Sequence, residues 1–304
     1  MPRTISVIVN AGSGLGNDDA LLHRLRTLFE ASGADADVRL ARGGGEIAAA
    51  VQAALARRPD VIVAGGGDGT VSTVASALAG GPVALGVLAL GTLNHFARDT
   101  GVPADLGLAV AAIVDGRPHT VDIGEVNGRT FINNSGLGLY PDIVRNRERQ
   151  QKRLGRGKWP AFVWATLAVL RRYPFMRVRL LVDGSERTRR TPFVFIGNNE
   201  YRMDGFAIGE RTELDRGQLS LYVAQRPGRL KLLVLALRAL TGRLRQARDF
   251  DAMGASEIVI ESRKKRLRVS TDGEVSVMTP PLRYRIRPRA LAVMLPEPAR
   301  PDRT

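Results

Sequence analysis

One decapeptide constrains this chain more than any other part of it: residues 61–70, with the sequence VIVAGGGDGT. Its apolar start predicts a short buried strand, and a glycine run then separates that strand from an amphipathic helix with Val71, Val74 and Leu78 on one face. A glycine loop between a strand and a helix N-terminus lets backbone N–H groups converge on a phosphate. Asp68 would repel a bare phosphate unless a cation or a hydroxyl proton lay between them. The decapeptide therefore points to phosphoryl chemistry on a nucleotide.

The positions of lysine narrow the kind of phosphate site. The first lysine is Lys152, so the first half of the chain has neither a G-x-x-x-x-G-K-[ST] loop nor the strand lysine of protein kinases. The G-x-G-x-x-G dinucleotide fingerprint is incomplete, because Thr70 holds its last position. Backbone amides, arginine and a divalent ion must then meet the phosphate charge. The alternative is a glycine turn that only lets the strand and the helix pack closely, and Asp68 and Thr70 argue against it.

The composition describes an ordinary globular chain with a strong positive charge. Its 304 residues suit two domains, with 44% hydrophobic and 25% charged residues. The absence of cysteine excludes disulfides, thiolate metal sites and cysteine nucleophiles, and the histidines His23, His95 and His119 are too scattered for a zinc motif. The net charge of +15 favours an anionic partner, which is nucleic acid, an anionic membrane surface or a nucleotide.

The sequence also predicts where the protein acts. No signal peptide is visible at the N-terminus, and the longest apolar runs, residues 161–170 and 232–237, are too short to span a bilayer. We therefore expect a cytoplasmic protein that associates peripherally with the inner face of the membrane.

Apolar runs and helical periods alternate through the first third of the chain. Strands are expected at residues 5–9, 36–40, 61–64 and 83–88, and helices at 18–31, 46–56 and 70–79. Strands joined by helical crossovers predict a parallel sheet covered on both faces, and its glycine-rich turns gather at the carboxyl edge. Residues 1–116 are thus predicted to form a nucleotide-binding α/β domain.

After residue 116 the pattern changes to short strands. Asn127-Gly128 predicts a hairpin turn between strands at 121–126 and 129–132. Further strands are expected at 176–182, 188–196, 218–224, 257–261, 266–270, 282–286 and 291–294, with helical insertions at 158–172 and 229–245. Residues 117–295 are therefore predicted to form a mostly antiparallel, sandwich-like β domain, and residues 296–304 a disordered tail.

Five motifs, taken in order, resemble the diacylglycerol kinase catalytic-domain family, which includes bacterial lipid kinases, sphingosine kinases and ceramide kinases. They are residues 10–14 (NAGSG), 66–70 (GGDGT), 90–98 (LGTLNHFAR), 121–122 with 131–138 (VD and FINNSGLG), and 272–274 (DGE). Each motif is weak alone, and the last, without the others, would favour an ordinary Asp-Gly turn. Because all five occur at compatible spacing over nearly the whole chain, the protein is identified as a member of this family.

The resemblance implies an ATP-dependent lipid kinase that transfers the γ-phosphate to the hydroxyl of a diacylglycerol-like membrane lipid, in phospholipid biosynthesis. It places ATP in the cleft between the domains and the lipid on the β domain. It implies that Glu274 is the base that accepts the alcohol proton, and that Asp68 and Asp122 are catalytic residues that anchor Mg²⁺ or its waters. For Asp122 a strand-end capping role is an equal alternative. The implied ATP contacts are Asn10, Ser13, Gly65, Gly66, Gly67, Asp68, Gly69, Thr70, Gly91, Thr92 and Asn94.

Two positions depart from the family's pattern. His95 stands where the family has a second acidic residue after Asn94, so one carboxylate is missing from the expected metal–water network. Bacterial relatives carry a Leu-Asp-Asp-Gly stretch that holds a structural Mg²⁺, and here that stretch contains Asp215 followed by Arg216. Either Asp215 holds the ion or the guanidinium replaces it, and we expect no tight structural metal.

A basic segment at residues 145–159 is the predicted membrane contact. The residues expected to face the membrane are Arg147, Arg149, Lys152, Arg153 and Trp159. Cations beside an interfacial aromatic residue suit an anionic lipid surface. Replacing these four basic residues by glutamine is expected to weaken vesicle binding more than ATP affinity. A second basic and apolar segment, around residues 230–240, is expected only to cover the β domain.

Three other functions stay open from the sequence. Asn199-Glu200 invites comparison with NAD kinases, which share the Gly-Gly-Asp-Gly-Thr loop and use an Asn-Glu pair on the ribose. His95 and Arg216 suit a non-catalytic nucleotide- or lipid-binding regulator. Charge alone would suit nucleic acid, although no recognition motif accompanies the arginines. The acceptor is equally open among diacylglycerol, monoacylglycerol, phosphatidylglycerol, a sphingoid base and an undecaprenol-like alcohol, and a homodimer is one of the open oligomeric states.

Overall fold

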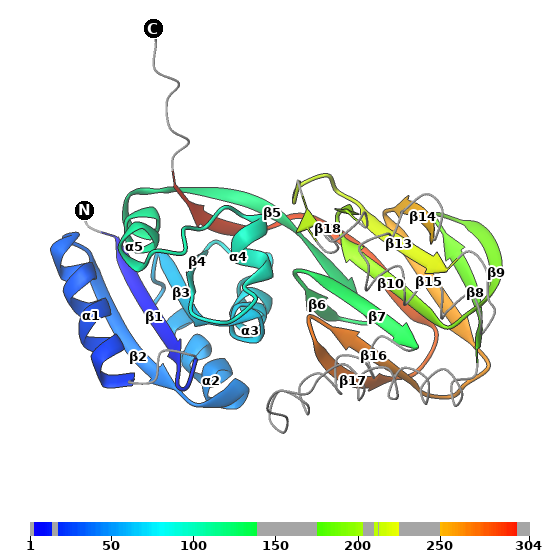
Figure 1. The fold of residues 1–304 in the computed structure, drawn as a ribbon, viewed down its shortest axis with the longest axis horizontal. Helices are drawn as coiled ribbons and strands as arrows, with labels where there is room; N and C mark the ends of the chain where they lie inside the picture. The colour runs from blue at the N-terminus through cyan, green and yellow to red at the C-terminus, as the bar shows by residue number, and fades with distance from the viewer. Residues whose placement is uncertain are drawn as a thin grey trace, which may run out of the picture. The chain divides into compact units, whose positions relative to one another are not determined.

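The computed structural model describes residues 3–13, 18–138, 175–202, 210–211, 213–224 and 250–296 (Figure 1). The chain divides into two compact units, the first formed by Met1–Ile123 with Pro288–Thr304 and the second by Gly124–Arg287. The predicted helices at 158–172 and 229–245, the basic segment at 145–159 and all but the first residue of the predicted tail lie outside the described residues.

The first unit is built on a parallel sheet. Its elements are β1 (Thr4–Asn10), α1 (Asp18–Ala31), β2 (Asp35–Ala41), α2 (Gly43–Leu55), β3 (Val61–Gly66), α3 (Asp68–Leu78), β4 (Ala84–Ala89), α4 (His95–Asp99), α5 (Leu106–Asp115) and parts of β5 (Arg117–Val126) and β18 (Leu282–Leu295). The strands lie in the order β2-β1-β3-β4-β18, and each neighbouring pair is parallel. The parallel sheet predicted from the sequence is therefore confirmed.

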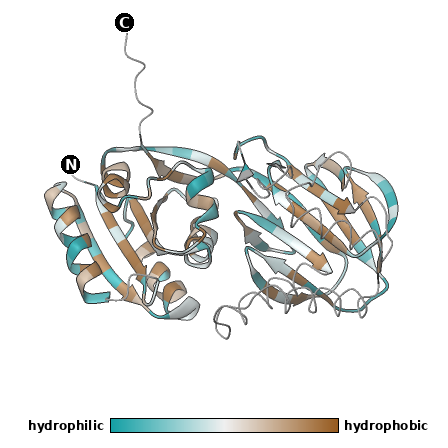
Figure 2. Ribbon diagram, viewed as in Figure 1, coloured by the Kyte–Doolittle hydropathy of each residue, from teal (hydrophilic) through white to brown (hydrophobic). Residues whose placement is uncertain are grey.

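Apolar residues on both faces of its strands explain why this sheet is covered twice. Val7 and Val63 face the layer in which α1 packs against α5. Ile8 and Ile62, each next to one of these valines in its strand, are as fully buried although they point the opposite way, where α2 packs against α3. In Figure 2 the strands are mainly hydrophobic, whereas α1 carries both hydrophobic and hydrophilic residues. Because neither face of these strands is exposed to solvent, a binding site can form only at the loops and the strand ends.

The second unit is a sandwich of two sheets. Its elements, besides the remainders of β5 and β18, are β6 (Arg129–Phe131), β7 (Asn134–Gly138), β8 (Met176–Val182), β9 (Ser185–Thr191), β10 (Phe193–Asn198), β11 (Tyr201–Arg202), β12 (Glu210–Arg211), β13 (Leu219–Ala224), β14 (Phe250–Ala255), β15 (Glu257–Ser262), β16 (Leu267–Thr271) and β17 (Glu274–Met278). One sheet has the order β14-β13-β10-β7-β16-β17, and the other continues from β18 through β15 and β8 to β9. All these pairs are antiparallel, as the sequence predicts.

A single apolar core holds the two sheets of the sandwich together. Leu137, Val194 and Val269 enter it from one sheet, and Val178 and Ile260 from the other, all of them fully buried. Alternation along each strand sends every second side chain inward, so the remaining positions are left for polar groups.

Two strand predictions are wrong. In both cases the chain changes its pairing partner within the segment concerned. The single strand expected at 188–196 is two strands, because Pro192 separates β9, which pairs with β8, from β10, which pairs with β7 and β13. Conversely, the strands expected at 282–286 and 291–294 are one strand, β18. Its first half pairs with β15 in the second unit and its second half with β4 in the first. Hydrophobic alternation reports burial and gives no indication of which sheet a strand joins.

Two helices lie where the sequence analysis expected none. The short helix α4 begins at His95, within the third motif, and α5 covers the apolar run that follows it. The start of α5 has a recognisable signal, since Asp105 caps it by accepting a hydrogen bond from the backbone N–H of Leu108 at 2.9 Å.

Candidate active site

The glycine loop of the decapeptide leads directly into α3. Gly67 is the N-cap of this helix and contributes no side-chain cap, while Asp68 begins its first turn. The backbone N–H groups of Thr70 and Val71 donate to the carbonyl of Gly67 at 3.0 and 3.1 Å. The amides that precede them are the donors that a helix start leaves without an intrahelical partner. A helix N-terminus of this kind attracts a phosphate through its N–H groups and its dipole.

A second loop packs against the first, and glycines make this contact possible. The N–H of Leu90 donates to the carbonyl of Gly66 at 3.1 Å. A Cβ at Gly91 would lie 2.4 Å from the Cα of Gly67, and one at Gly66 would lie 2.5 Å from Oγ1 of Thr70. Neither distance leaves room for a side chain. The structure therefore brings together the predicted ATP-binding residues of the second and third motifs.

Asn94 shapes this second loop from within. Its backbone is left-handed, with φ of 48°. Its side-chain oxygen accepts the N–H of Gly91 at 3.0 Å, and its amide nitrogen donates to the carbonyl of Gly91 at 2.8 Å. The side chain is thus used to fold the loop, whereas Thr92 is exposed on it.

His95 lies next to the loop, at the start of α4. Its Nδ1 is 3.1 Å from the guanidinium of Arg98, so this nitrogen is the acceptor. The N–H of Phe96, the next residue, points at Oδ1 of Asp68 over 3.4 Å. His95, the residue that departs from the family pattern, is thus the chain neighbour of Phe96, whose N–H contacts Asp68.

The first motif forms a turn at the carboxyl end of β1. The hydroxyl of Ser13 donates to the carbonyl of Asn10 at 2.6 Å, and its N–H donates to the same oxygen at 3.2 Å. Asn10 and Ser13 are both partly exposed. β1 and β3 are parallel neighbours, so this turn and the glycine loop follow adjacent strands of one sheet.

Asp122 is completely buried in β5. One oxygen of its carboxylate accepts the backbone N–H of Arg289 at 2.8 Å, where the β18 backbone has a left-handed φ of 51°. This bond holds an irregular point of β18. It differs from the capping of chain neighbours at a strand end that was considered for Asp122, because Asp122 lies inside β5 and Arg289 is 167 residues away. The role of Asp122 toward Mg²⁺ stays a prediction.

The Asp-Gly-Glu motif is the turn between β16 and β17. Asp272, with φ of 48°, accepts three backbone N–H groups, those of Ile132 at 2.8 Å, Asn133 at 2.8 Å and Asn134 at 3.0 Å. These amides belong to the segment between β6 and β7, about 140 residues earlier in the chain. Asp272 therefore fixes the turn to the fourth motif, and the first residue after the turn is Glu274.

Arg129 contacts the carboxylate of Glu274. Its guanidinium lies 2.5 Å from Oε2, and both side chains are well exposed, at 39% and 62%. No local pattern predicts this partner, because 145 residues separate the two. An exposed guanidinium beside an exposed carboxylate leaves the carboxylate accessible while restricting its orientation.

A buried arginine, Arg211, donates hydrogen bonds to the segment that Asp272 also contacts. Arg211 is 4% exposed, and one guanidinium nitrogen donates to the carbonyl of Ile132 at 2.7 Å. Another donates to the side-chain oxygen of Asn133 at 2.8 Å, and the guanidinium also lies over the ring of Tyr201. The short strand β12 that carries Arg211 has no recognisable pattern, so the sequence offered no signal for it.

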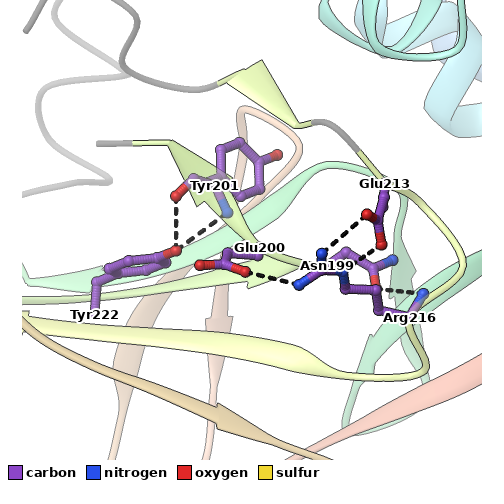
Figure 3. A network of polar contacts seen from close by, with 6 residues as sticks. All are labelled: Asn199, Glu200, Tyr201, Glu213, Arg216 and Tyr222. Carbon is purple, nitrogen blue, oxygen red and sulfur yellow. Dashed lines mark hydrogen bonds and ion pairs between the residues drawn. The ribbon is translucent and has the colours of Figure 1, made fainter. Parts of the chain in front are cut away.

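The position predicted for a structural metal carries an ion-pair network instead (Figure 3). Arg216 donates to Glu213 at 2.9 Å and pairs with Glu200 at 3.1 Å. The hydrogen bond and charge of Glu213 raise the pKa of Arg216, and the same hydrogen bond lowers the pKa of Glu213. Asp215 is exposed. Within the ranges described, no three acidic or histidine side chains form a group that could hold a metal ion. These residues do not fit a structural Mg²⁺.

The same network involves the pair that suggested NAD binding. Asn199 is completely buried, and its side-chain oxygen accepts the backbone N–H of Arg216 at 3.1 Å. Glu200 is the ion-pair partner of Arg216. The burial of Asn199 and the ion pair of Glu200 with Arg216 argue against the NAD kinase interpretation.

No helix in the described ranges is both long and apolar enough to cross a membrane.

Comparison with known proteins agrees with the architecture. The sequence model of the diacylglycerol kinase catalytic domain matches residues 4–126, and that of the YegS C-terminal NAD kinase beta sandwich-like domain matches residues 141–295. A relative from Pseudomonas fluorescens, named probable lipid kinase YegS-like, is 29% identical over 93% of this chain and 94% of its own. The diacylglycerol kinase of Bacillus subtilis is 26% identical over 90% of each chain.

A crystal structure with the same fold is known for a diacylglycerol kinase. The crystal structure of a diacylglycerol kinase from Bacillus anthracis matches 98% of each chain with a TM-score of 0.73 at 22% sequence identity. At this identity the likeness shows the fold alone. With the two domain matches and the named relatives, it leads to one conclusion: the chain belongs to the diacylglycerol kinase family of YegS-like lipid kinases, and it is a phosphotransferase.

Proposed function

We propose that this lipid kinase uses ATP and Mg²⁺ to phosphorylate the hydroxyl of a diacylglycerol-like membrane lipid. The observation that carries the proposal is the start of α3, where glycines replace side-chain caps and Asp68 occupies the first turn. The N–H groups there are suited to the ATP phosphates. Glycines pack this loop against the one that carries Thr92, which supports the remaining predicted ATP contacts. The predicted inter-domain cleft is part of this proposal.

Asp68 is the side chain proposed to hold the metal. It is partly exposed at the helix start, whereas Asp122 is buried and bonded to the backbone of β18. Mg²⁺ is commonly held by one or two carboxylates together with waters and substrate phosphates, so Asp68 alone fits the donor set. When bound, the ion supplies positive charge that offsets the charge developing on the phosphates.

Glu274 is the proposed base. An alcohol has too high a pKa to attack unaided, so a carboxylate must accept its proton as the bond to phosphorus forms. Glu274 suits this task because its carboxylate is exposed and follows a turn that three backbone hydrogen bonds hold in place. Arg129 orients it. The lipid is proposed to bind the β domain, with the protein at the inner membrane surface through residues 145–159.

The test is phosphate transfer to a total bacterial lipid extract in detergent micelles, with γ-labelled ATP and Mg²⁺. Glu274→Gln is expected to lower the rate by a factor of about 10² to 10⁴. Glu30→Gln, the same change at an exposed position of α1, serves as the control. Label in an organic-phase product that Glu274→Gln abolishes supports the proposal, and the mobility of the product identifies the acceptor class. Transfer to NAD in place of lipid, or ATP binding without transfer, would contradict it.

A further inference from the structure

The outermost strand of the six-stranded sheet exposes apolar side chains. β17 ends this sheet, and it carries Val275 at 36% and Val277 at 61% exposure. Only two other large hydrophobic side chains of the described residues are exposed, Leu93 and Leu108. Val275 and Val277 are two residues apart on one strand, so they project from the same face. Solvent-exposed valines at alternate positions of an edge strand form an apolar ridge. Their exposed side chains are not part of the hydrophobic core.

A run of cations adjoins this ridge. The turn from β15 to β16 and the start of β16 read Arg263, Lys264, Lys265, Arg266, Leu267 and Arg268, and every cation in it is exposed. Across the described chain, the side chains of residues 263–266 form no ion pair, in contrast to the paired Arg179, Arg216 and Arg285. The run from residue 263 to residue 268 contains five cations and no acidic residue.

The strand register places the two features on one surface. Arg268 lies opposite Val277 across the β16–β17 ladder. Paired residues of an antiparallel ladder project from the same face, and residues 263–266 directly precede the strand that carries Arg268. We name residues 263–266 together with Arg268, Val275 and Val277 the basic edge.

We propose that the basic edge docks the protein on an anionic lipid bilayer, a proposal that rests on the proposed function. Cations beside exposed apolar side chains match a surface that offers negative headgroups above hydrocarbon. A second copy of the chain pairing through β17 is disfavoured, because it would bring two such cation runs together. Glu274 begins the same strand, with its side chain on the opposite face from Val275 and Val277, so docking through β17 keeps the proposed base near the membrane that carries its substrate.

Vesicle sedimentation of the full chain tests the proposal without turnover. The probe is vesicles of phosphatidylglycerol and phosphatidylcholine, with pure phosphatidylcholine for comparison. Lys264→Gln/Lys265→Gln/Arg266→Gln is expected to weaken binding to the anionic vesicles about a hundred-fold, the effect of three basic side chains at such a surface. The control, Arg24→Gln/Arg187→Gln/Arg283→Gln, removes the same charge at exposed positions elsewhere and should weaken binding by less than about three-fold.

The valines are tested in the same assay. Val275→Ser/Val277→Ser is expected to weaken binding about ten-fold, and Leu108→Ser, at a residue 62% exposed on α5, to leave it unchanged. Equal binding by the basic-edge variants and their controls would overturn the proposal. So would a wild-type dimer in sedimentation velocity that Val275→Ser/Val277→Ser dissociates while vesicle binding stays intact.

Phosphate transfer to dihexanoylglycerol in solution separates this proposal from the function on which it rests. The lysine and arginine variant should retain the wild-type rate there and lose activity only on vesicles. Absence of transfer by the wild-type protein would refute the proposed function, and the sedimentation result would still decide whether the basic edge binds membranes.

Discussion

At the scale of single residues, Asp272 shows how one carboxylate can organise a site. It accepts three backbone N–H groups of residues 132–134, and nearby Arg211 donates to the carbonyl of Ile132. Asp272 in the turn after β16 thus holds the donors of this short segment, and Arg211 on β12, with the opposite charge, holds one of its acceptors. Hydrogen bonds to charged groups are stronger than those between neutral ones, so this segment should be rigid. Because Glu274 directly follows the turn that contains Asp272, the rigid segment also fixes the position of Glu274.

Replacing Asp272 tests this organisation. Asp272→Ala is expected to lower the free energy of unfolding by about 3 kcal/mol, because it leaves three amides without their acceptor. Asp105→Ala removes a carboxylate that accepts a single amide at the start of α5 and should cost about 1 kcal/mol. Urea denaturation measures both variants. Equal losses would show that the three hydrogen bonds of Asp272 contribute no more than an ordinary helix cap.

Tyr284 links a buried residue to pH. Burial raises the pKa of this phenol, whose hydroxyl lies 3.1 Å from that of Ser135 inside the sandwich. In the unfolded chain a tyrosine loses its proton near pH 10, whereas the folded protein keeps it. Above pH 10, deprotonation of this tyrosine stabilises the unfolded state but not the folded one. The contribution of Tyr284 to the free energy of unfolding is therefore complete below pH 10 and is lost as the pH rises above it.

The expected result is a difference in slope. Between pH 9 and pH 11 the stability of the wild-type protein should fall more steeply than that of Tyr284→Phe, as measured by urea denaturation at each pH. At pH 8 the variant should be about 1 kcal/mol less stable, since the hydroxyl of Ser135 loses its partner. Parallel curves above pH 9 would mean that Tyr284 ionises equally easily in both states.

At the scale of elements, contact between two glycine loops builds the proposed phosphate site. The loop before α3 and the loop before α4 touch where Gly67 meets Gly91. Neither loop could approach the other if a side chain intervened. This explains why glycine is required here for close approach, although neither residue has a positive φ.

Gly91→Ala should therefore separate the loops. A Cβ 2.4 Å from the backbone of Gly67 forces a shift, which we expect to cost about 1–3 kcal/mol of stability and to weaken ATP binding at least ten-fold. Gly44→Ala is the matched control, because a Cβ at this position of α2 meets nothing within 4 Å. Alanine in a helix should raise stability there by about 0.5–1 kcal/mol. Thermal unfolding and ATP titration of both variants measure the contrast, and similar behaviour would refute the steric argument.

At the scale of the whole molecule, β18 belongs to both units. Leu291, Val293 and Met294, near the end of the chain, are buried in the first unit. The carbonyl of Ala290 also accepts the N–H of Gly80 from the turn after α3. The first unit is therefore incomplete until β18 has been added to it.

Truncation tests this dependence. A chain that ends at Arg287 loses three buried side chains and the parallel neighbour of β4, so its first unit should be destabilised by more than about 5 kcal/mol and lose ATP binding. A chain that ends at Pro296 retains all of β18 and should unfold like the full protein. Hydrogen exchange of β1 and β3 is the measurement. Unchanged protection in the shorter chain would show that β18 is dispensable to the first sheet.

Local sequence patterns were enough to predict the parallel sheet, the mostly antiparallel second domain and the glycine loops. They were enough because hydrophobic period, glycine runs and short motifs act within a few residues of one another. The predicted residues Gly66 to Thr70 and Gly91 to Asn94 lie together for the same reason, since consecutive strand-to-helix turns share one edge of a parallel sheet.

The contacts between distant segments could be identified only from the folded structure. The contact of Arg129 with Glu274, the support of Ile132 by Asp272 and the division of β18 between two units all join positions far apart in the chain. Such pairings depend on strand register and on which sheet each strand enters, and a local pattern carries neither. The carboxylate of Asp122 looked like a metal ligand or a cap in the sequence, and the fold gives it a backbone amide of β18 as a partner because burial leaves a charged oxygen in need of a donor.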